Sequence, residues 1–164
     1  MKKVNTLITN DVETTSLLNH KLRDKTADYV LSQGMPRLLD LYDKYGVKAT
    51  FFYTGHIAKI KPEVVKMAYE RGHEIGSHGL SHKVEHAFDV LNYDEQIYHL
   101  TESKNRIEDI TGESIISFRA PAARVQENTG RALIETGFKI DSSIASQRLD
   151  MFFSFDYKKI IKIK

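Results

Sequence analysis

The chain has 164 residues, and 24 lysine and arginine residues nearly balance 22 aspartate and glutamate residues, which gives a formal net charge of +2. That balance argues against a nucleic-acid partner, and the absence of cysteine excludes a disulfide scaffold. No apolar run approaches the roughly 20 residues of a membrane span, so we expect one globular domain over residues 1–164 with no membrane span. Because the N-terminus lacks the apolar stretch of a signal peptide, we predict a cytoplasmic location.

Strand-like and helix-like segments alternate along the chain. The strand candidates are residues 4–9, 47–53, 74–77, 115–118 and 138–141. A helix-like segment before each of the last four strands ends in a glycine, the residue that best adopts the left-handed conformation just past a helix: Gly46, Gly72, Gly112 and Gly137. This alternation predicts a parallel α/β sheet or barrel.

Start signals support the helices. Pro62 stands where a first helical residue belongs, and Asn92 with Glu95 three residues later has the spacing of a capping box. Apolar residues recur at helical spacing in residues 38–45 and, less regularly, in residues 97–111. We therefore expect helices in these segments.

Polar residues that could carry chemistry fall at or after the ends of the predicted strands. They are Asp11 and Glu13 after the first strand, His78 and His82 after the third, Arg119 after the fourth and Asp141 at the end of the fifth. In parallel α/β proteins the loops at the carboxyl ends of the strands converge and form the functional face. We therefore expect these residues to share one rim.

Two histidines, His78 and His82, are four residues apart directly after a strand. On one helical turn they would face the same side, near enough to share a metal ion. Two imidazoles with one carboxylate suit Zn²⁺ and leave positions open for water and substrate. The same spacing, taken alone, is also compatible with an ordinary helix start that carries two exposed histidines and binds no metal. His56, His73 and His86 have no partner at ligand spacing, and we interpret them as structural or rim residues.

Asp11 and Glu13 are two residues apart, so both point to one side if the strand pleat persists. One carboxylate could bind a metal ion while the other takes a proton from water. The alternative interpretation is an ordinary solvated turn after the strand. Arg119 follows an apolar strand, where it could hold a carboxylate through a bidentate pair. An ordinary surface salt bridge is the alternative for that arginine.

Taken in order, these segments resemble the polysaccharide deacetylases, the NodB-homology domains of carbohydrate esterase family 4. The resemblance covers residues 4–150 and is carried by Lys-Ala-Thr-Phe-Phe at 48–52, Gly-His-Glu-Ile-Gly-Ser-His at 72–78 running into His82, and Phe-Arg-Ala-Pro at 118–121. It implies a deformed (β/α) barrel and a metal-dependent hydrolase that removes acetyl groups from N-acetylated sugars. The implied cofactor is one divalent metal ion, with Zn²⁺ favoured, and the implied partner is an N-acetylated carbohydrate substrate.

The resemblance also implies roles for the rim residues. His78 and His82 match the two metal histidines of the family, and Arg119 matches the arginine that orients the base. Asp11 and Glu13 fit a subset that separates its two acids by one residue, which makes Asp11 the general base and Glu13 the third ligand.

A rival alignment makes Asp11 the metal ligand and puts Asn10 in the place of the base. On either alignment, we expect Pro121 and His20 near the substrate.

The chain departs from the family pattern in two ways. The family usually supplies its proton donor from a histidine late in the domain, whereas no histidine follows His99. Five strands also fall short of the seven or eight that close such a barrel. We therefore predict a barrel that is incomplete at the C-terminus, with unpaired strand edges that favour a homo-oligomer. A non-catalytic metal- or glycan-binding module is the alternative function.

Overall fold

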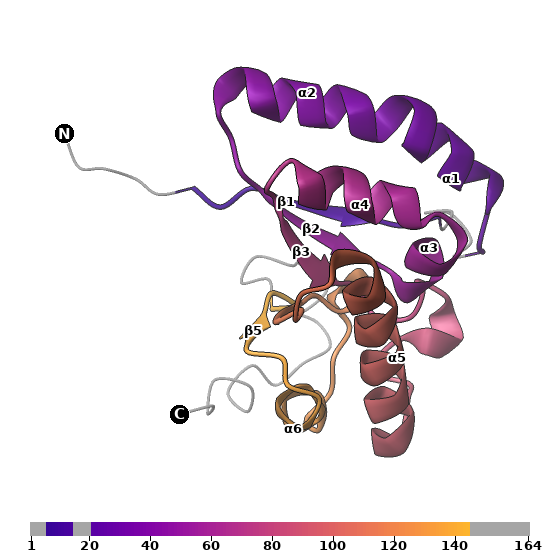
Figure 1. Ribbon diagram of the computed structural model, residues 1–164. Helices are drawn as coiled ribbons and strands as arrows, with labels where there is room; N and C mark the ends of the chain where they lie inside the picture. Colours follow the sequence, from indigo (N-terminus) through magenta and orange to yellow (C-terminus); the bar gives the residue numbers. More distant parts are fainter. Residues whose placement is uncertain (1–5, 15–20, 145–164) are drawn as a thin grey trace.

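The computed structural model describes residues 6–14 and 21–144 (Figure 1). Within these residues there are five strands: β1 (Thr9–Val12), β2 (Thr50–Tyr53), β3 (Glu74–Ser77), β4 (Ser117–Phe118) and β5 (Ile140–Asp141). Neighbouring strands pair in parallel, and their order in the sheet is the order of the chain. The prediction of a parallel α/β sheet is confirmed.

Helices fill the connections between the strands. Before β2 the chain forms α1 (Lys25–Tyr29), a π-helical stretch (Val30–Gly34) and α2 (Met35–Tyr45) in direct succession. The later connections contain α3 (Gly55–Ile60) and α4 (Pro62–Glu70), then α5 (Tyr93–Thr111), then α6 (Thr129–Glu135). Two short 3₁₀ turns, Val84–His86 and Pro121–Ala123, follow β3 and β4.

The helix boundaries follow the sequence signals. Gly46 and Gly112 adopt φ angles of 63° and 72° directly after α2 and α5, which lets the chain leave each helix. At the start of α5, the Asn92 side chain accepts a hydrogen bond from the Glu95 N–H, and the Glu95 carboxylate accepts one from the Asn92 N–H. The predicted capping box is therefore confirmed.

The helices form one layer along the outside of the sheet. Contacts join α2 to α4, α4 to α5 and α5 to α6, and Figure 1 shows α2 and α4 on one side of strands β1 to β3 with α5 and α6 following towards β5. The core lies between this layer and the sheet, where Phe51, Tyr53 and Ile75 join helix residues such as Leu39 and Val64. Sequential parallel strands with crossovers of one hand are the arrangement of a (β/α) barrel.

The first strand begins later than predicted. Residues 4–9 were expected to form it, but β1 spans Thr9–Val12 and includes Asp11. Pairing decides this position, because Thr9 lies opposite Thr50 and Val12 opposite Tyr53. The pairing starts here because β2 itself begins at Thr50, whose N–H donates to the Ile8 carbonyl at 3.0 Å. Residues 4 and 5 of the predicted strand lie outside the described residues.

The five strands end at one level. The register pairs Val12 with Tyr53, Tyr53 with Ser77, Ser77 with Phe118 and Phe118 with Asp141. The residues immediately after the strands therefore stand in one row at the carboxyl edge of the sheet: Glu13, Thr54, His78, Arg119 and Ser142. We call this set the rim row.

In the described residues the sheet is open, because β1 and β5 each pair on one side only. No helix within the described ranges combines the length and apolar character needed to cross a bilayer.

Candidate active site

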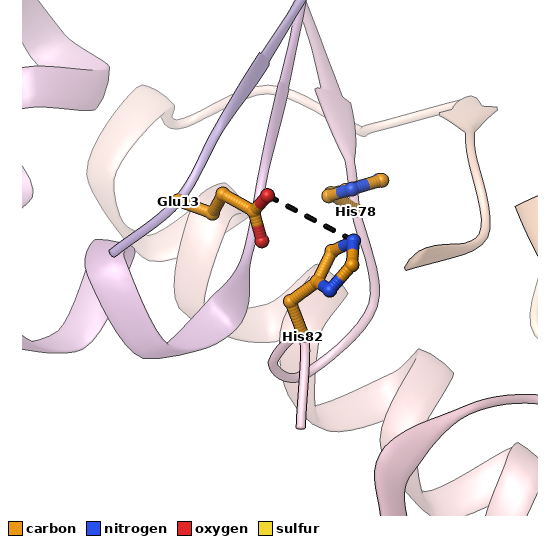
Figure 2. A group of neighbouring side chains, drawn as sticks. All are labelled: Glu13, His78 and His82. Atoms are coloured by element: carbon orange, nitrogen blue, oxygen red, sulfur yellow. Dashed lines mark ion pairs between the residues drawn. The ribbon is translucent and has the colours of Figure 1, made fainter. Parts of the chain in front are cut away.

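Three side chains gather at the carboxyl edge of the sheet. Glu13, His78 and His82 each bring one ligand atom to within 4.8 Å of the others, and Figure 2 shows them pointing toward one another. Glu13 Oε1 lies 3.8 Å from His82 Nε2, and the two imidazole ring centroids are 5.6 Å apart. Among residues 6–14 and 21–144 no other group of three histidine, aspartate or glutamate side chains has this geometry.

The histidines converge by a different route from the one predicted. A helical turn was expected at residues 78–82, but this segment is a loop. Gly79 has a φ of +65°, and its carbonyl accepts a hydrogen bond from the Gly55 N–H at 2.9 Å. The Leu80 carbonyl likewise accepts one from the His56 N–H at 2.8 Å. These bonds tie the loop to the start of α3, and the positive φ of Gly79 departs from helical geometry.

His78 is held in the form that binds metal ions. It is buried, and its Nδ1–H donates to the Arg119 carbonyl oxygen at 2.7 Å. That bond assigns the proton to Nδ1 and leaves the Nε2 lone pair to the ligand group. Burial, the largest cause, lowers the pKa of His78 to about 4, so the ring is neutral near pH 7.

His82 lies beside a strained turn. The Ala122 N–H donates to His82 Nε2 at 3.1 Å. Ala122 and Ala123 have φ angles of 54° and 52°, a left-handed conformation that costs residues with a Cβ roughly 1–2 kcal/mol each. Strain of this kind persists where the surrounding structure fixes the backbone, often at functional sites. The sequence carried no signal for this turn, since alanine rarely adopts positive φ.

Asp11 and Arg119 form a second pair at the rim. Arg119 Nη1 donates to Asp11 Oδ1 at 2.9 Å, while Asp11 Oδ2 lies 4.0 Å from His78 Nε2. The contact is between one nitrogen and one oxygen, because Arg119 Nη2 donates to Thr9 Oγ1 at 3.0 Å instead. The guanidinium also lies over the Phe52 ring, 4.5 Å from its centroid. The carboxylate is thus held beside the ligand group without belonging to it.

The other histidines make structural contacts, as interpreted from the sequence. His73 is buried, and its Nδ1 accepts a hydrogen bond from the Ala49 N–H at 3.2 Å. His56 Nε2 lies 2.7 Å from the Asp24 carboxylate, and His86 Nδ1 lies 2.6 Å from Ser81 Oγ.

Pro121 and His20, the two residues predicted near the substrate, stay predictions. Pro121 is buried, and its ring faces Gly79 in the loop between His78 and His82. His20 lies outside the described residues.

A parallel sheet with two histidines and a carboxylate just past the carboxyl ends of its strands offers a donor set that could hold a divalent metal ion. Residues 24–140 match the family described as polysaccharide deacetylase. The chain belongs to this family, the NodB-homology domains of carbohydrate esterase family 4. The predicted family is thereby confirmed.

Relatives support the same assignment. A peptidoglycan deacetylase of Helicobacter pylori is 37% identical over 111 residues, which cover 68% of this chain and 37% of that protein. A Mycobacterium smegmatis structure assigned to the polysaccharide deacetylases has 30% identity and a TM-score of 0.72, covering 84% of this chain and 50% of that one. A family 4 carbohydrate esterase from Bacillus anthracis has 25% identity and a TM-score of 0.64, covering 82% and 56%.

These matches confirm the predicted α/β fold of the deacetylase type. The chain spans about a third of the length of the curated relative and about half of the two structures.

Proposed function

We propose that this chain carries the metal-binding and base residues of a deacetylase that hydrolyses the acetamido group of an N-acetylated sugar. The observation that carries the proposal is the Glu13, His78 and His82 group with Asp11 Oδ2 4.0 Å from His78 Nε2. Membership of the polysaccharide deacetylase family supports the reaction class. The relatives named as peptidoglycan deacetylases make an N-acetylated glycan the substrate to test.

The three ligand residues fit one divalent ion, for which we propose Zn²⁺. Two imidazole nitrogens and one carboxylate oxygen are the donor set of catalytic zinc sites, which keep a further position for water. The neutral His78 ring and its bond to the Arg119 carbonyl favour ligation through Nε2. An ion bound there would lower the pKa of a bound water molecule and would polarise the acetyl carbonyl.

Glu13 is our third ligand and Asp11 our general base. Glu13 belongs to the group within 4.8 Å, whereas Asp11 is engaged by the Arg119 guanidinium at 2.9 Å. In the rival alignment Asp11 is the ligand, and its carboxylate would have to bind both the metal ion and the Arg119 guanidinium. As the base, Asp11 accepts the proton of the attacking water while Arg119 holds its orientation through the contact at 2.9 Å.

The strained turn offers a donor for the negative charge that develops on the acetyl oxygen. Ala122 presents its N–H at this rim, 3.1 Å from His82 Nε2. A backbone N–H that bonds to such an oxyanion contributes on the order of 3 kcal/mol to the transition state. A metal ion bound at His82 Nε2 would take the lone pair that this N–H now uses, and we assign the Ala122 N–H so released to the oxyanion.

A non-catalytic metal- or glycan-binding module is the second candidate. One observation favours it: His99, the last histidine within residues 1–164, is buried on α5 and lies outside the ligand group. This candidate predicts metal binding without acetate release.

Calorimetric zinc titration of the metal-free chain tests the ligand set. We expect one ion per chain, with binding abolished by Glu13→Ala and by His78→Ala. His56→Ala and Glu127→Ala are matched controls that remove the same residue types away from the site, and binding should persist in both. A folded chain that binds no zinc would overturn the metal site, and loss of binding in His78→Ala alone would move the third ligand to Asp11.

Acetate release from N-acetylglucosamine oligomers, measured on the same samples, separates the two candidates. Release that requires zinc and is lost in Asp11→Asn supports the hydrolase. Tight zinc binding with no release supports the binding module. The cytoplasmic location and the homo-oligomer stay predictions, and light scattering of the purified chain tests the second.

A further inference from the structure

Arg119 is anchored on the side that faces away from Asp11. Its Nη2 donates to Ser142 Oγ at 2.7 Å and to Thr9 Oγ1 at 3.0 Å, and its Nε lies 3.4 Å from the Ser142 carbonyl oxygen. Nη1 is the nitrogen that meets Asp11 Oδ1. Because the guanidinium is a rigid planar fork, fixing Nη2 and Nε also fixes the direction of Nη1.

The backbone around Ser142 is itself held at the end of β4. The Ser142 N–H donates to the Phe118 carbonyl at 2.8 Å, which continues the ladder of the sheet by one residue. Next to it, Ser143 Oγ accepts a hydrogen bond from the Ala120 N–H at 2.8 Å, and the Ser143 N–H and hydroxyl both donate to the Asp141 carboxylate. Ser142 therefore meets Arg119 from a fixed position in the rim row.

We propose that Ser142 is a positioning residue that orients the Arg119 guanidinium toward Asp11. Without the Ser142 hydroxyl, Arg119 Nη2 keeps only its hydrogen bond to Thr9. The Phe52 ring flanks the guanidinium and does not fix how the guanidinium is turned within its own plane. The hydrogen bond from Arg119 to the Ser142 hydroxyl involves a charged donor and is therefore stronger than a bond between neutral groups. Its loss should leave the guanidinium freer to rotate. The catalytic consequence rests on the proposed function, whereas the anchoring does not.

The anchoring can be measured without catalysis. Rotation of an arginine side chain about its Nε–Cζ bond averages the Nη–H signals in the NMR spectrum, and anchored nitrogens resist that averaging. In the ¹⁵N-labelled full chain, Arg119→Lys identifies the signals of Arg119 by their loss. We expect Ser142→Ala to speed this rotation on the order of tenfold, the effect of losing one charge-assisted hydrogen bond.

Two variants control for general loosening. Ser142→Thr keeps the hydroxyl and should preserve the slow rotation, whereas Ser114→Ala removes an exposed hydroxyl elsewhere and should leave it unchanged. Thermal unfolding checks that every variant is folded. Unchanged rotation in a folded Ser142→Ala variant would refute the anchoring, and so would faster rotation in Ser114→Ala of the same size.

Deacetylation kinetics then test the consequence. In Ser142→Ala we expect kcat to fall about tenfold with KM unchanged, because a misdirected arginine weakens the base more than it weakens substrate binding. The same change in an Arg119→Gln background should alter kcat less than twofold, since the residue through which Ser142 acts is gone. Equal losses in both backgrounds would contradict a role through Arg119. If the parent chain releases no acetate, the hydrolase proposal fails while the NMR result still decides the anchoring.

Discussion

Acid should destabilise the metal-free protein through His99, a histidine of α5 that lies outside the ligand group. The ring is 7% exposed, its Nδ1 has no hydrogen-bond partner in the described part of the chain, and the ring of His86 stands edge-on at 4.6 Å. Burial is the largest cause that lowers the pKa of His99, to about 4, and His86 adds to the effect. The folded protein thus opposes protonation at this position.

The sign of the effect follows from proton uptake. In the unfolded chain His99 has its ordinary pKa of 6.5, so the unfolded state binds a proton in a range where the folded state does not. The stabilising contribution is therefore complete above about pH 6.5 and is lost as the pH falls toward 4. Between about pH 7 and about pH 4.5 the loss amounts to about 2–3 kcal/mol.

Urea unfolding of the metal-free chain across this pH range measures the loss. In His99→Gln, which carries no proton-binding group there, the fall in unfolding free energy should be smaller by about 2–3 kcal/mol. Tyr98→Phe is the matched control, because it keeps the neighbouring ring and removes no group that titrates in acid. The reasoning is refuted if wild type and His99→Gln lose the same free energy on acidification.

Two further substitutions test the backbone around the site. In Gly76→Ala the new Cβ would lie 2.7 Å from the Phe52 ring, so we expect urea unfolding to show a loss of about 1–3 kcal/mol. Gly34→Ala is its control, with nothing within 4 Å of the added atom, and equal losses in both would contradict the steric argument. Ala122→Gly removes the left-handed strain and should raise stability by up to about 1 kcal/mol in the same assay. A loss of stability there would show that the alanine side chain contributes more than the strain costs.

The later strand ends could be read from the sequence. The predicted carboxyl ends at Tyr53, Ser77, Phe118 and Asp141 coincide with those of β2 to β5. Polar residues or a turn follow each apolar run, so local composition marks where a strand stops. The start of a strand depends instead on its partner, which local sequence does not contain. For that reason β1 was predicted at residues 4–9 and lies at Thr9–Val12.

The candidate site was predictable to the same extent. Residue type and spacing single out His78, His82 and Glu13 as candidates, and the structure brings these three side chains together. Ser142 and Ala122 could not be found in this way. Ser142 reaches Arg119 only because β4 and β5 share a register, and the left-handed backbone of Ala122 reflects its surroundings rather than its side chain.

The register of β1 links the chemistry of the rim to the packing of the core. Thr9 and Asp11 of this strand and Glu13 just after it alternate with Val12, which is buried. A slip of one residue against β2 would turn the carboxylates toward the helices and expose the valine. Both consequences are unfavourable, since a buried carboxylate loses hydration and Arg119 loses its partner. Core packing therefore selects the same register that the site requires, and a stable fold already has its carboxylates beside the two histidines.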